Sequence, residues 1–218
     1  PLTVFLVLTI VNSINLIDGI DGLASGLCFM ILFVFVLLFV NNRPSAYSFM
    51  ASALMGSLIA FFYFNFFGKV KKGTKTFMGD TGSLILGYAI AYLALKYAMN
   101  NPSIFPYRQE ALLWPYTVLI VPTFAVARVT LGRLARRAPV FKADKTHIHH
   151  KIMQAGFSMH QALYIILSLF VFYCLLNTVL FDISQSYNLL VVADVLSYAA
   201  FFAMLRAVAK GTKNVPAA

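Results

Sequence analysis

The stretch LASGLCFMILFVFVLLFV, residues 23–40, is an uninterrupted run of apolar and small residues without a single charged side chain. A helix that crosses a membrane needs about 17 to 25 mostly apolar residues, so this run is long enough to span one. Lipid offers no hydrogen-bond partner to the backbone, which makes a helix the default, and the short alternating strands typical of a membrane barrel are absent from the sequence. We therefore interpret residues 23–40 as a transmembrane helix.

Five further stretches meet the same criterion, and residues 1–11 resemble the end of another span. The predicted spans are residues 1–11, 23–40, 47–66, 82–99, 112–128, 161–180 and 188–208. Composition agrees, because 61% of the 218 residues are hydrophobic and only 11% are charged, against about 25% charged in soluble domains. The expected fold class is all-α: a polytopic transmembrane helical bundle of about seven spans, forming one integral membrane domain over residues 1–218.

Basic residues are distributed unequally between the two ends of these spans. Alternating spans place residues 12–22, 67–81, 129–160 and the tail after residue 208 on one side, and this side carries 14 of the 17 Lys and Arg residues. The positive-inside rule makes it the cytoplasmic side. The net charge of +10 then reflects membrane topology, and we expect no nucleic-acid partner. Cys28 and Cys174 lie inside apolar runs and are interpreted as packing residues.

The first polar motif on this side is NSINLIDGIDGLASG, residues 12–26. Its polar residues recur at every third position: Asn12, Asn15, Asp18 and Asp21. On a helix the first three share one arc, while Asp21 rejoins them only if the chain breaks at Gly19 or Gly22. A polar loop that caps two helices is the alternative. Oxygen ligands of this type suit Mg²⁺, which takes one or two protein ligands and completes its shell with water and substrate phosphates.

The second motif is KTFMGDTGSLILG, residues 75–87, at the start of a predicted span. Asp80 or Ser83 is expected either to cap the helix or, as a metal ligand, to lie beside a helix start that binds anions. A lysine group precedes it: Lys69, Lys71, Lys72 and Lys75. These lysines are interpreted either as membrane-flanking charge or as ligands of anionic headgroups and phosphate.

The third motif is KADKTHIHHKIMQAGFS, residues 142–158, in the longest cytoplasmic loop. It clusters His147, His149 and His150 beside lysines, an arrangement that favours phosphate binding over zinc or a merely solvated loop. Four arginines precede the loop as orientation signals, one of which is able to reach a pyrophosphate: Arg128, Arg133, Arg136 and Arg137. Within the last span, Asp194 is an ionisable group whose role stays open.

With these motifs in order, the chain resembles the polyprenyl-phosphate N-acetylhexosamine-1-phosphate transferase superfamily. The combination NxxNxxDGxDG, FMGDTGS and HIHH carries the resemblance over most of the chain. Its HIHH form is more similar to the enzymes that begin O-antigen, common-antigen and teichoic-acid linkage lipids than to the peptidoglycan translocase. The resemblance implies transfer of a sugar-1-phosphate, GlcNAc-1-phosphate above all, from a UDP-N-acetylhexosamine to undecaprenyl phosphate with release of UMP, as the first membrane step of a cell-surface glycan.

The same resemblance implies roles for individual residues. Asn15 and Asp80 match ligands of Mg²⁺, with Mn²⁺ as the alternative ion, and Asp21 matches a residue that contacts the uracil. The expected catalytic residues are Asp18, Asp80, His147, His149 and His150. The expected substrate-binding residues are Asn12, Asp21, Lys145 and Arg133. The implied location is the bacterial inner membrane with the site on the cytoplasmic face, and a homodimer is left open.

One departure concerns an aspartate pair and additional spans that family members carry upstream of the first motif. No adjacent Asp-Asp occurs in these 218 residues, so we expect an N-terminally incomplete chain that turns over little by itself. Two other functional classes are kept: an ion-coupled transporter whose carboxylates bind the moving ion, and a catalytically inactive scaffold. A transporter would place such residues near the bilayer midplane, whereas here they cluster at span ends.

Overall fold

The computed structural model describes residues 1–41, 46–100, 107–137 and 147–213. Its elements are α1 (Leu2–Ile17), α2 (Leu23–Asn41), α3 (Ala46–Phe62), the π-helix η1 (Tyr63–Phe67), the 3-10 helix η2 (Val70–Lys72), α4 (Gly79–Ala98), α5 (Leu113–Ala135), α6 (Ile148–Gln154), α7 (Met159–Ser184) and α8 (Tyr187–Lys213). All regular structure in the described ranges is helical, which confirms the prediction of an all-α fold.

The described part of the chain contains five helices that are long and apolar enough to cross a membrane: α2, α3 with its continuation to Phe67, α5, α7 and α8. Two more helices lie at the remaining predicted spans, the 16-residue α1 and the 20-residue α4. The chain is therefore a multi-pass helical membrane protein.

The helices extend further into the predicted cytoplasmic loops than hydropathy alone indicates. Helix α1 continues to Ile17 and includes Asn12 and Asn15, while α4 already begins at Gly79. Helix α5 continues to Ala135, and α6 occupies part of the third loop. These helix ends lie within the predicted cytoplasmic segments 12–22, 67–81 and 129–160, because the polar interface adds several ångströms beyond the hydrocarbon core and a helix continues through it.

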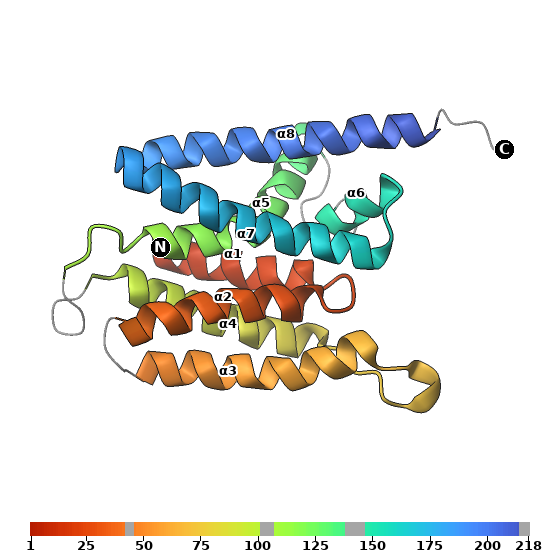
Figure 1. Ribbon diagram of the computed structural model, residues 1–218, viewed down its shortest axis with the longest axis horizontal. Helices are drawn as coiled ribbons and strands as arrows, with labels where there is room; N and C mark the ends of the chain where they lie inside the picture. Colours follow the sequence, from red (N-terminus) through yellow and green to blue (C-terminus); the bar gives the residue numbers. More distant parts are fainter. Residues whose placement is uncertain (42–45, 101–106, 138–146, 214–218) are drawn as a thin grey trace. The chain divides into compact units, whose positions relative to one another are not determined.

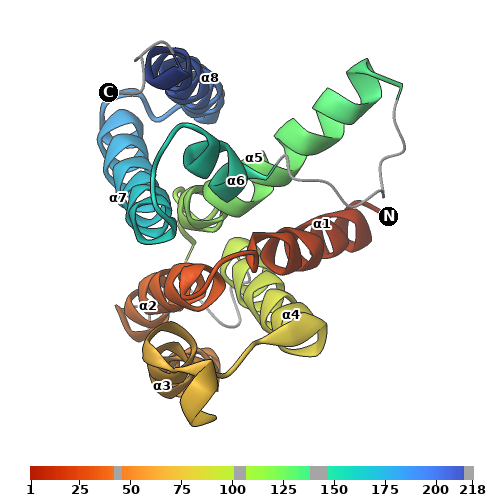
Figure 2. The same cartoon turned by 90° about the vertical axis from the view of Figure 1, so that its right-hand side faces the viewer.

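The chain forms two compact units, Pro1–Val126 and Ala127–Ala218. In the first, α2 packs against α3 and α4, and α1 packs against α4 (Figures 1 and 2). Apolar side chains fill the contact, with Phe35 and Phe39 of α2 and Ile90 of α4 fully buried. The ring of Phe39 meets that of Tyr97 edge-on at a centroid distance of 5.6 Å. These contacts hold α2 against α4.

The contact between α1 and α4 is unusually close at Gly87. A β-carbon at this position would lie 2.9 Å from the Cα and 3.1 Å from the carbonyl oxygen of Val11. Only glycine lets the two backbones approach in this way, as in other membrane helix pairs. The absence of a side chain at Gly87 therefore sets the spacing of α1 and α4.

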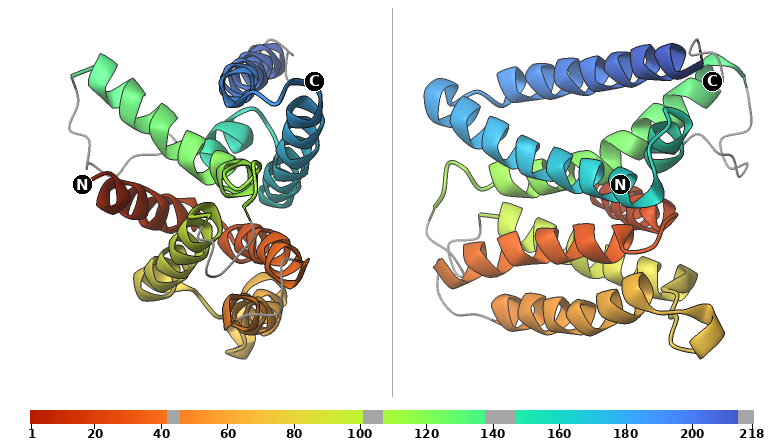
Figure 3. Two further views of the ribbon diagram at one scale, coloured as in Figure 1. Left: turned by 90° about the vertical axis from the view of Figure 1, so that its left-hand side faces the viewer. Right: turned by 45° about the vertical axis from the view of Figure 1, so that its right-hand side comes forward.

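The second unit contains the hairpin of α7 and α8, with the short α6 packed against α7 (Figure 3). Helix α7 begins with a capping box in which Ser158 and Gln161 exchange side-chain to backbone hydrogen bonds of 3.2 and 2.8 Å. Between the two helices, Asn177 Nδ2 donates to Asp194 Oδ2 at 3.2 Å, and both residues are fully buried. Asp194 thus has a partner on the neighbouring helix, which is how a buried polar group in a span is normally accommodated.

Replacing Gly87 with Ala is expected to destabilise the protein by about 1 kcal/mol or more. The new methyl group meets the rigid backbone of Val11, and overpacking of this kind costs about 1–3 kcal/mol, which exceeds the gain in helix propensity. Thermal unfolding in detergent measures the effect.

Gly56→Ala is the matched control for this substitution. Gly56 lies in α3, and its β-carbon would meet nothing within 4 Å. We expect this variant to unfold at the wild-type temperature or slightly above it. Equal stability of the two variants would contradict the close approach at Gly87.

Candidate active site

Asn15 and Asp80 meet across the contact of α1 and α4. Asn15 lies near the end of α1 and Asp80 in the first turn of α4. The Nδ2 of Asn15 donates to Asp80 Oδ1 at 3.0 Å and to Ser83 Oγ at 2.9 Å. The close approach at Gly87, two helical turns from Asp80, makes this pairing possible. The structure thus brings together the two residues that the sequence assigns as metal ligands.

Capping does not explain the second motif. The N-cap of α4 is Met78, without a side-chain capping bond. The Oγ of Ser83 donates back to the carbonyl oxygens of Gly79 and Asp80, at 3.0 and 3.1 Å, and binds no free amide of the first turn. The alternative of an N-cap at Asp80 or Ser83 is therefore wrong, since both residues lie inside the helix.

Asp18 concentrates negative charge beside this pair. It is the C-cap of α1 and is only partly exposed. Burial raises the pKa of the Asp18 carboxyl above its ordinary value, and the negative charges of Asp21 and then Asp80 raise it further. A cation placed among these carboxylates would reverse the shift, because an opposite charge within a few ångströms favours the ionised form.

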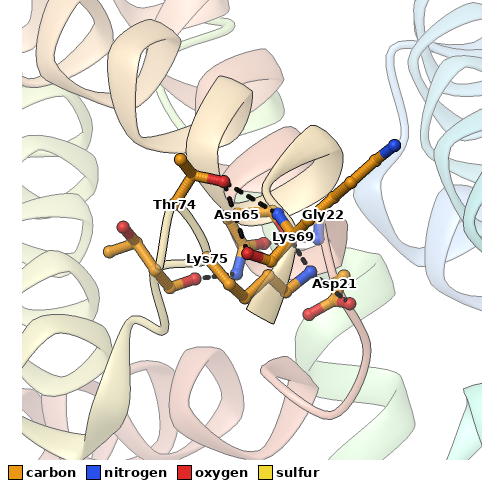
Figure 4. A network of polar contacts seen from close by, with 7 residues as sticks. Asp21, Gly22, Asn65, Lys69, Thr74 and Lys75 are labelled. Carbon is orange, nitrogen blue, oxygen red and sulfur yellow. Dashed lines mark hydrogen bonds and ion pairs between the residues drawn. The ribbon is translucent and has the colours of Figure 1, made fainter. Parts of the chain in front are cut away.

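Asn65 joins the two loops that flank the site. It lies in the π-helix η1, and its side chain is buried. Its Oδ1 accepts from the amide of Gly22 at 2.7 Å, and its Nδ2 donates to the carbonyl oxygen of Thr76 at 2.8 Å (Figure 4). The sequence analysis did not predict a role for Asn65. A polar side chain within the apolar run FFYFNFF could have indicated one, because such residues in membrane spans usually have a partner or a function. Asn65 ties the loop after α1 to the loop before α4.

Lys75 and Asp21 form an ion pair in the same network. The Nζ of Lys75 lies 2.6 Å from Asp21 Oδ2 and also contacts the backbone carbonyl of Asn65 (Figure 4). Both side chains are mostly buried, so the pair is less screened than one at the surface. Lys75 thus has a defined role beyond that of a membrane-flanking charge. The positive φ of Gly22, 78°, supplies the chain break between Asp18 and α2 that the sequence predicted.

The acidic residues fit Mg²⁺ as a partly protein-bound ion. No group of three or more His, Cys, Asp or Glu in the described ranges is arranged to hold a metal, but Mg²⁺ normally takes only one or two carboxylates. Asp18 and Asp80 supply carboxylates whose mutual repulsion a divalent cation would relieve. Asn15 presents its Nδ2 to Asp80, so its Oδ1 becomes a metal ligand only after the side-chain amide group has rotated.

The three histidines gather around the start of α6 in the second unit. The rings of His147 and His149 stack with centroids 6.0 Å apart, and His150 lies 4.3 Å from His149. His149 is buried, and its Nδ1 has no hydrogen-bond partner among the described residues. Burial, followed by the neighbouring His150 and His147, lowers the pKa of His149 to about 4. His149 is therefore neutral near pH 7.

The remaining substrate-binding residues lie in different places. Asn12 is exposed on α1, one turn before Asn15. Arg133 lies on α5, in the second unit, and lines a basic pocket there. Lys145 lies outside the described residues.

Replacing Asn65 with Ala is expected to lower the free energy of unfolding by about 2–4 kcal/mol. The change leaves the amide of Gly22 and the carbonyl of Thr76 without their partner, and each buried group left unsatisfied costs about 1–3 kcal/mol. Chemical denaturation in detergent measures the loss.

Thr74→Val is the control for Asn65→Ala. The Thr74 hydroxyl accepts from the amide of Lys69 at 2.9 Å in an exposed position, where water replaces it. A loss in Thr74→Val as large as in Asn65→Ala would refute a special contribution of Asn65.

The lowered pKa of His149 predicts a loss of stability in acid. The pKa is about 4 in the folded state and 6.5 in the reference state. As the pH falls through 6.5, the unfolded chain binds a proton that the folded chain does not, so stability declines until about pH 4, by about 2–3 kcal/mol in total. His149→Gln should remove this part of the decline, as measured by denaturation at pH 7 and pH 4.5. His160→Gln, at an exposed histidine of α7, should keep it.

Comparison with known proteins places these motifs in a family. Residues 1–98 match the family described as "Glycosyl transferase family 4". The chain is 34% identical over 166 residues to the "Probable undecaprenyl-phosphate N-acetylglucosaminyl 1-phosphate transferase" of Bacillus subtilis, covering 76% of this chain and 44% of the relative. It is 30% identical over 166 residues to the "Undecaprenyl-phosphate alpha-N-acetylglucosaminyl 1-phosphate transferase" of Escherichia coli K12, covering 76% of this chain and 43% of the relative.

A relative of the same name from Yersinia pestis is 29% identical over 164 residues, which cover 75% of this chain and 43% of the relative. The chain thus spans less than half the length of the curated relatives it matches. No solved structure matches it. The matched segment, residues 1–98, contains the pairing of Asn15 with Asp80, the Asp18 carboxylate and the Asn65 network. Through this segment the chain is similar to members of glycosyl transferase family 4.

Proposed function

We propose that this chain forms part of a transferase that moves N-acetylhexosamine-1-phosphate, most simply GlcNAc-1-phosphate, from a UDP-sugar to undecaprenyl phosphate with release of UMP. The pairing of Asn15 with Asp80 across α1 and α4, next to Asp18, carries the proposal. It supplies charged and hydrogen-bonding groups at the ends of spans, where a lipid phosphate and a soluble nucleotide sugar are able to meet. The names of the relatives support N-acetylglucosaminyl 1-phosphate as the transferred group and undecaprenyl phosphate as the acceptor.

Mg²⁺, with Mn²⁺ as the alternative, is proposed at Asp80 and Asp18, with Asn15 after its amide has turned. When bound, the ion supplies charge neutralisation to the phosphates of the donor. In its absence, burial and the negative charges of Asp21 and Asp80 raise the pKa of the Asp18 carboxyl. Asn15 holds the Asp80 side chain in position through its hydrogen bond to Oδ1, and the Ser83 hydroxyl accepts a second hydrogen bond from the same amide.

Asp21 and Lys75 are proposed to organise the nucleotide end of the site. Their ion pair is anchored to the carbonyl of Asn65, so the loop after α1 offers a carboxylate at a fixed place. Asp21 Oδ2 is occupied by Lys75, which leaves Oδ1 as the acceptor for an N–H donor such as a uracil ring. The neutral His149 is proposed to act by hydrogen bonding at its unpartnered Nδ1, while His147 and His150 contact the sugar and pyrophosphate.

The proposed location is the bacterial inner membrane, with this site on the cytoplasmic face. The basic residues of the segments that flank the site support that orientation. The UDP-sugar would reach the site from the same side, because nucleotide sugars are soluble cytoplasmic metabolites that do not cross a membrane unaided.

Asp80→Asn in the full-length protein tests the proposed function. Membranes containing it are assayed with radiolabelled UDP-GlcNAc and undecaprenyl phosphate, with and without Mg²⁺. We expect wild-type membranes to transfer label to the lipid only when Mg²⁺ is present. The variant should transfer label at least about 100-fold more slowly, because it lacks a carboxylate that helps to stabilise the charge that develops during transfer.

Asp182→Asn is the matched control, since it makes the same chemical change at an exposed position near the end of α7. It should label lipid at the wild-type rate. Unchanged labelling in Asp80→Asn would defeat the site assignment. Ion flux into vesicles without any lipid labelling would favour the transporter instead.

A further inference from the structure

A strongly basic pocket lies in the second unit. It has a volume of about 590 Å³ and is lined from α5, α6 and α8. Its cationic lining residues are Arg128, Arg133, Arg136, Lys151, Arg206 and Lys210. No acidic residue is among the described residues that line it. Arg133, which the resemblance implies as a substrate-binding residue, is among the cationic lining residues, and the proposed function gives the other five no role.

The convergence of these charges requires a physical explanation. Orientation of a membrane protein needs basic residues on one side of the membrane, and it does not need them in one pocket. Like charges drawn together from three helices repel one another, and this repulsion is strongest next to an apolar, low-dielectric wall. A bound polyanion turns the repulsion into attraction, and guanidinium groups match phosphate oxygens in bidentate geometry.

The other wall of the pocket is apolar and holds one arginine in place. Val129, Phe202 and Leu205 are buried there. The guanidinium of Arg128 lies over the Phe202 ring, 4.3 Å from its centroid, which is a favourable cation–π distance. The pocket therefore presents a pre-positioned cation and an apolar surface together, which suits a ligand with both an anionic and a hydrocarbon part.

The pocket also lies at the end of a membrane-crossing helix, where anionic headgroups with hydrocarbon chains occur. Arg206 and Lys210 lie in the last two turns or so of the membrane-crossing part of α8, Tyr187–Lys210. This end is on the side that the charge asymmetry predicts to be cytoplasmic. Lipid headgroups lie at this depth, and basic pockets between membrane helices on the cytoplasmic side bind anionic ones.

We propose that this pocket binds the phosphate headgroup of an anionic glycerophospholipid of the surrounding membrane. The arginines and lysines contact the phosphate, and the acyl chains lie along Phe202 and Leu205. The proposal does not depend on the transferase reaction, and its test measures lipid binding alone.

The test uses the full-length protein in detergent, titrated with phosphatidylglycerol or with phosphatidylcholine and followed by native mass spectrometry. We expect phosphatidylglycerol to bind at least about tenfold more tightly. In the triple variant Arg136→Gln, Arg206→Gln, Lys210→Gln, its affinity should fall about 100-fold, since each basic residue near a membrane surface contributes about 1 kcal/mol. The single variant Arg206→Gln should lose about fivefold, which keeps the test decisive if the triple variant does not fold.

The control variant removes the same charge elsewhere on the basic side. Its substitutions are Lys71→Gln, Lys72→Gln and Arg137→Gln, at exposed positions that do not line the pocket. It should bind phosphatidylglycerol within about twofold of the wild-type affinity. Equal loss in the control, equal affinity for phosphatidylcholine, or displacement of the lipid by an equal concentration of inorganic phosphate would each overturn the proposal; the last would indicate a site for a soluble anion.

Discussion

Gly87 lies where α4 meets α1, and a β-carbon there would come within 2.9 Å of the backbone of Val11. This backbone contact governs the geometry of the first unit. It lets Asn15 of α1 reach Asp80 and Ser83 of α4 with hydrogen bonds of 3.0 and 2.9 Å. If the two helices were further apart, the side chains of Asn15 and Asp80 would hydrogen-bond to water and not to each other. The acidic site therefore depends on the absence of a side chain two turns away from it.

The loops beside this contact are held by a single buried amide. Asn65 accepts from Gly22 and donates to Thr76, and its carbonyl contacts Lys75. Asn65 lies in the π-helical turn η1, which follows directly on α3. Gly68 follows immediately, and a β-carbon there would collide with the backbone of Phe64, Thr74 and Lys75. The polar network is thus built into the end of a membrane span, where backbone groups still need partners.

Charge is sorted between the two units. The first gathers three aspartates, where burial and then the charges of Asp21 and Asp80 raise the pKa of Asp18, and the second lines a pocket with six basic residues. Both arrangements concentrate like charges at the ends of spans. Each is favoured when a ligand of opposite charge is present: a divalent cation with phosphates in one case and an anionic headgroup in the other. The buried hydrogen bond between Asn177 and Asp194 is of another kind, since its donor and its acceptor both belong to the α7–α8 hairpin.

The sequence by itself determined the helical membrane fold, the positions of the spans and the motif residues Asn15, Asp18, Asp21 and Asp80. Each of these follows from local information, because a run of apolar residues needs a helix in lipid and a motif is continuous in the chain. Only the tertiary structure decided that Asn15 bonds to Asp80, 65 residues away, that Asn65 bridges two loops, and that six basic residues share one pocket. It also decided that His149 stays neutral, since burial and two neighbouring imidazoles set its pKa. Contacts of this kind depend on how closely helices cross, and hydropathy along the chain carries no information about that distance.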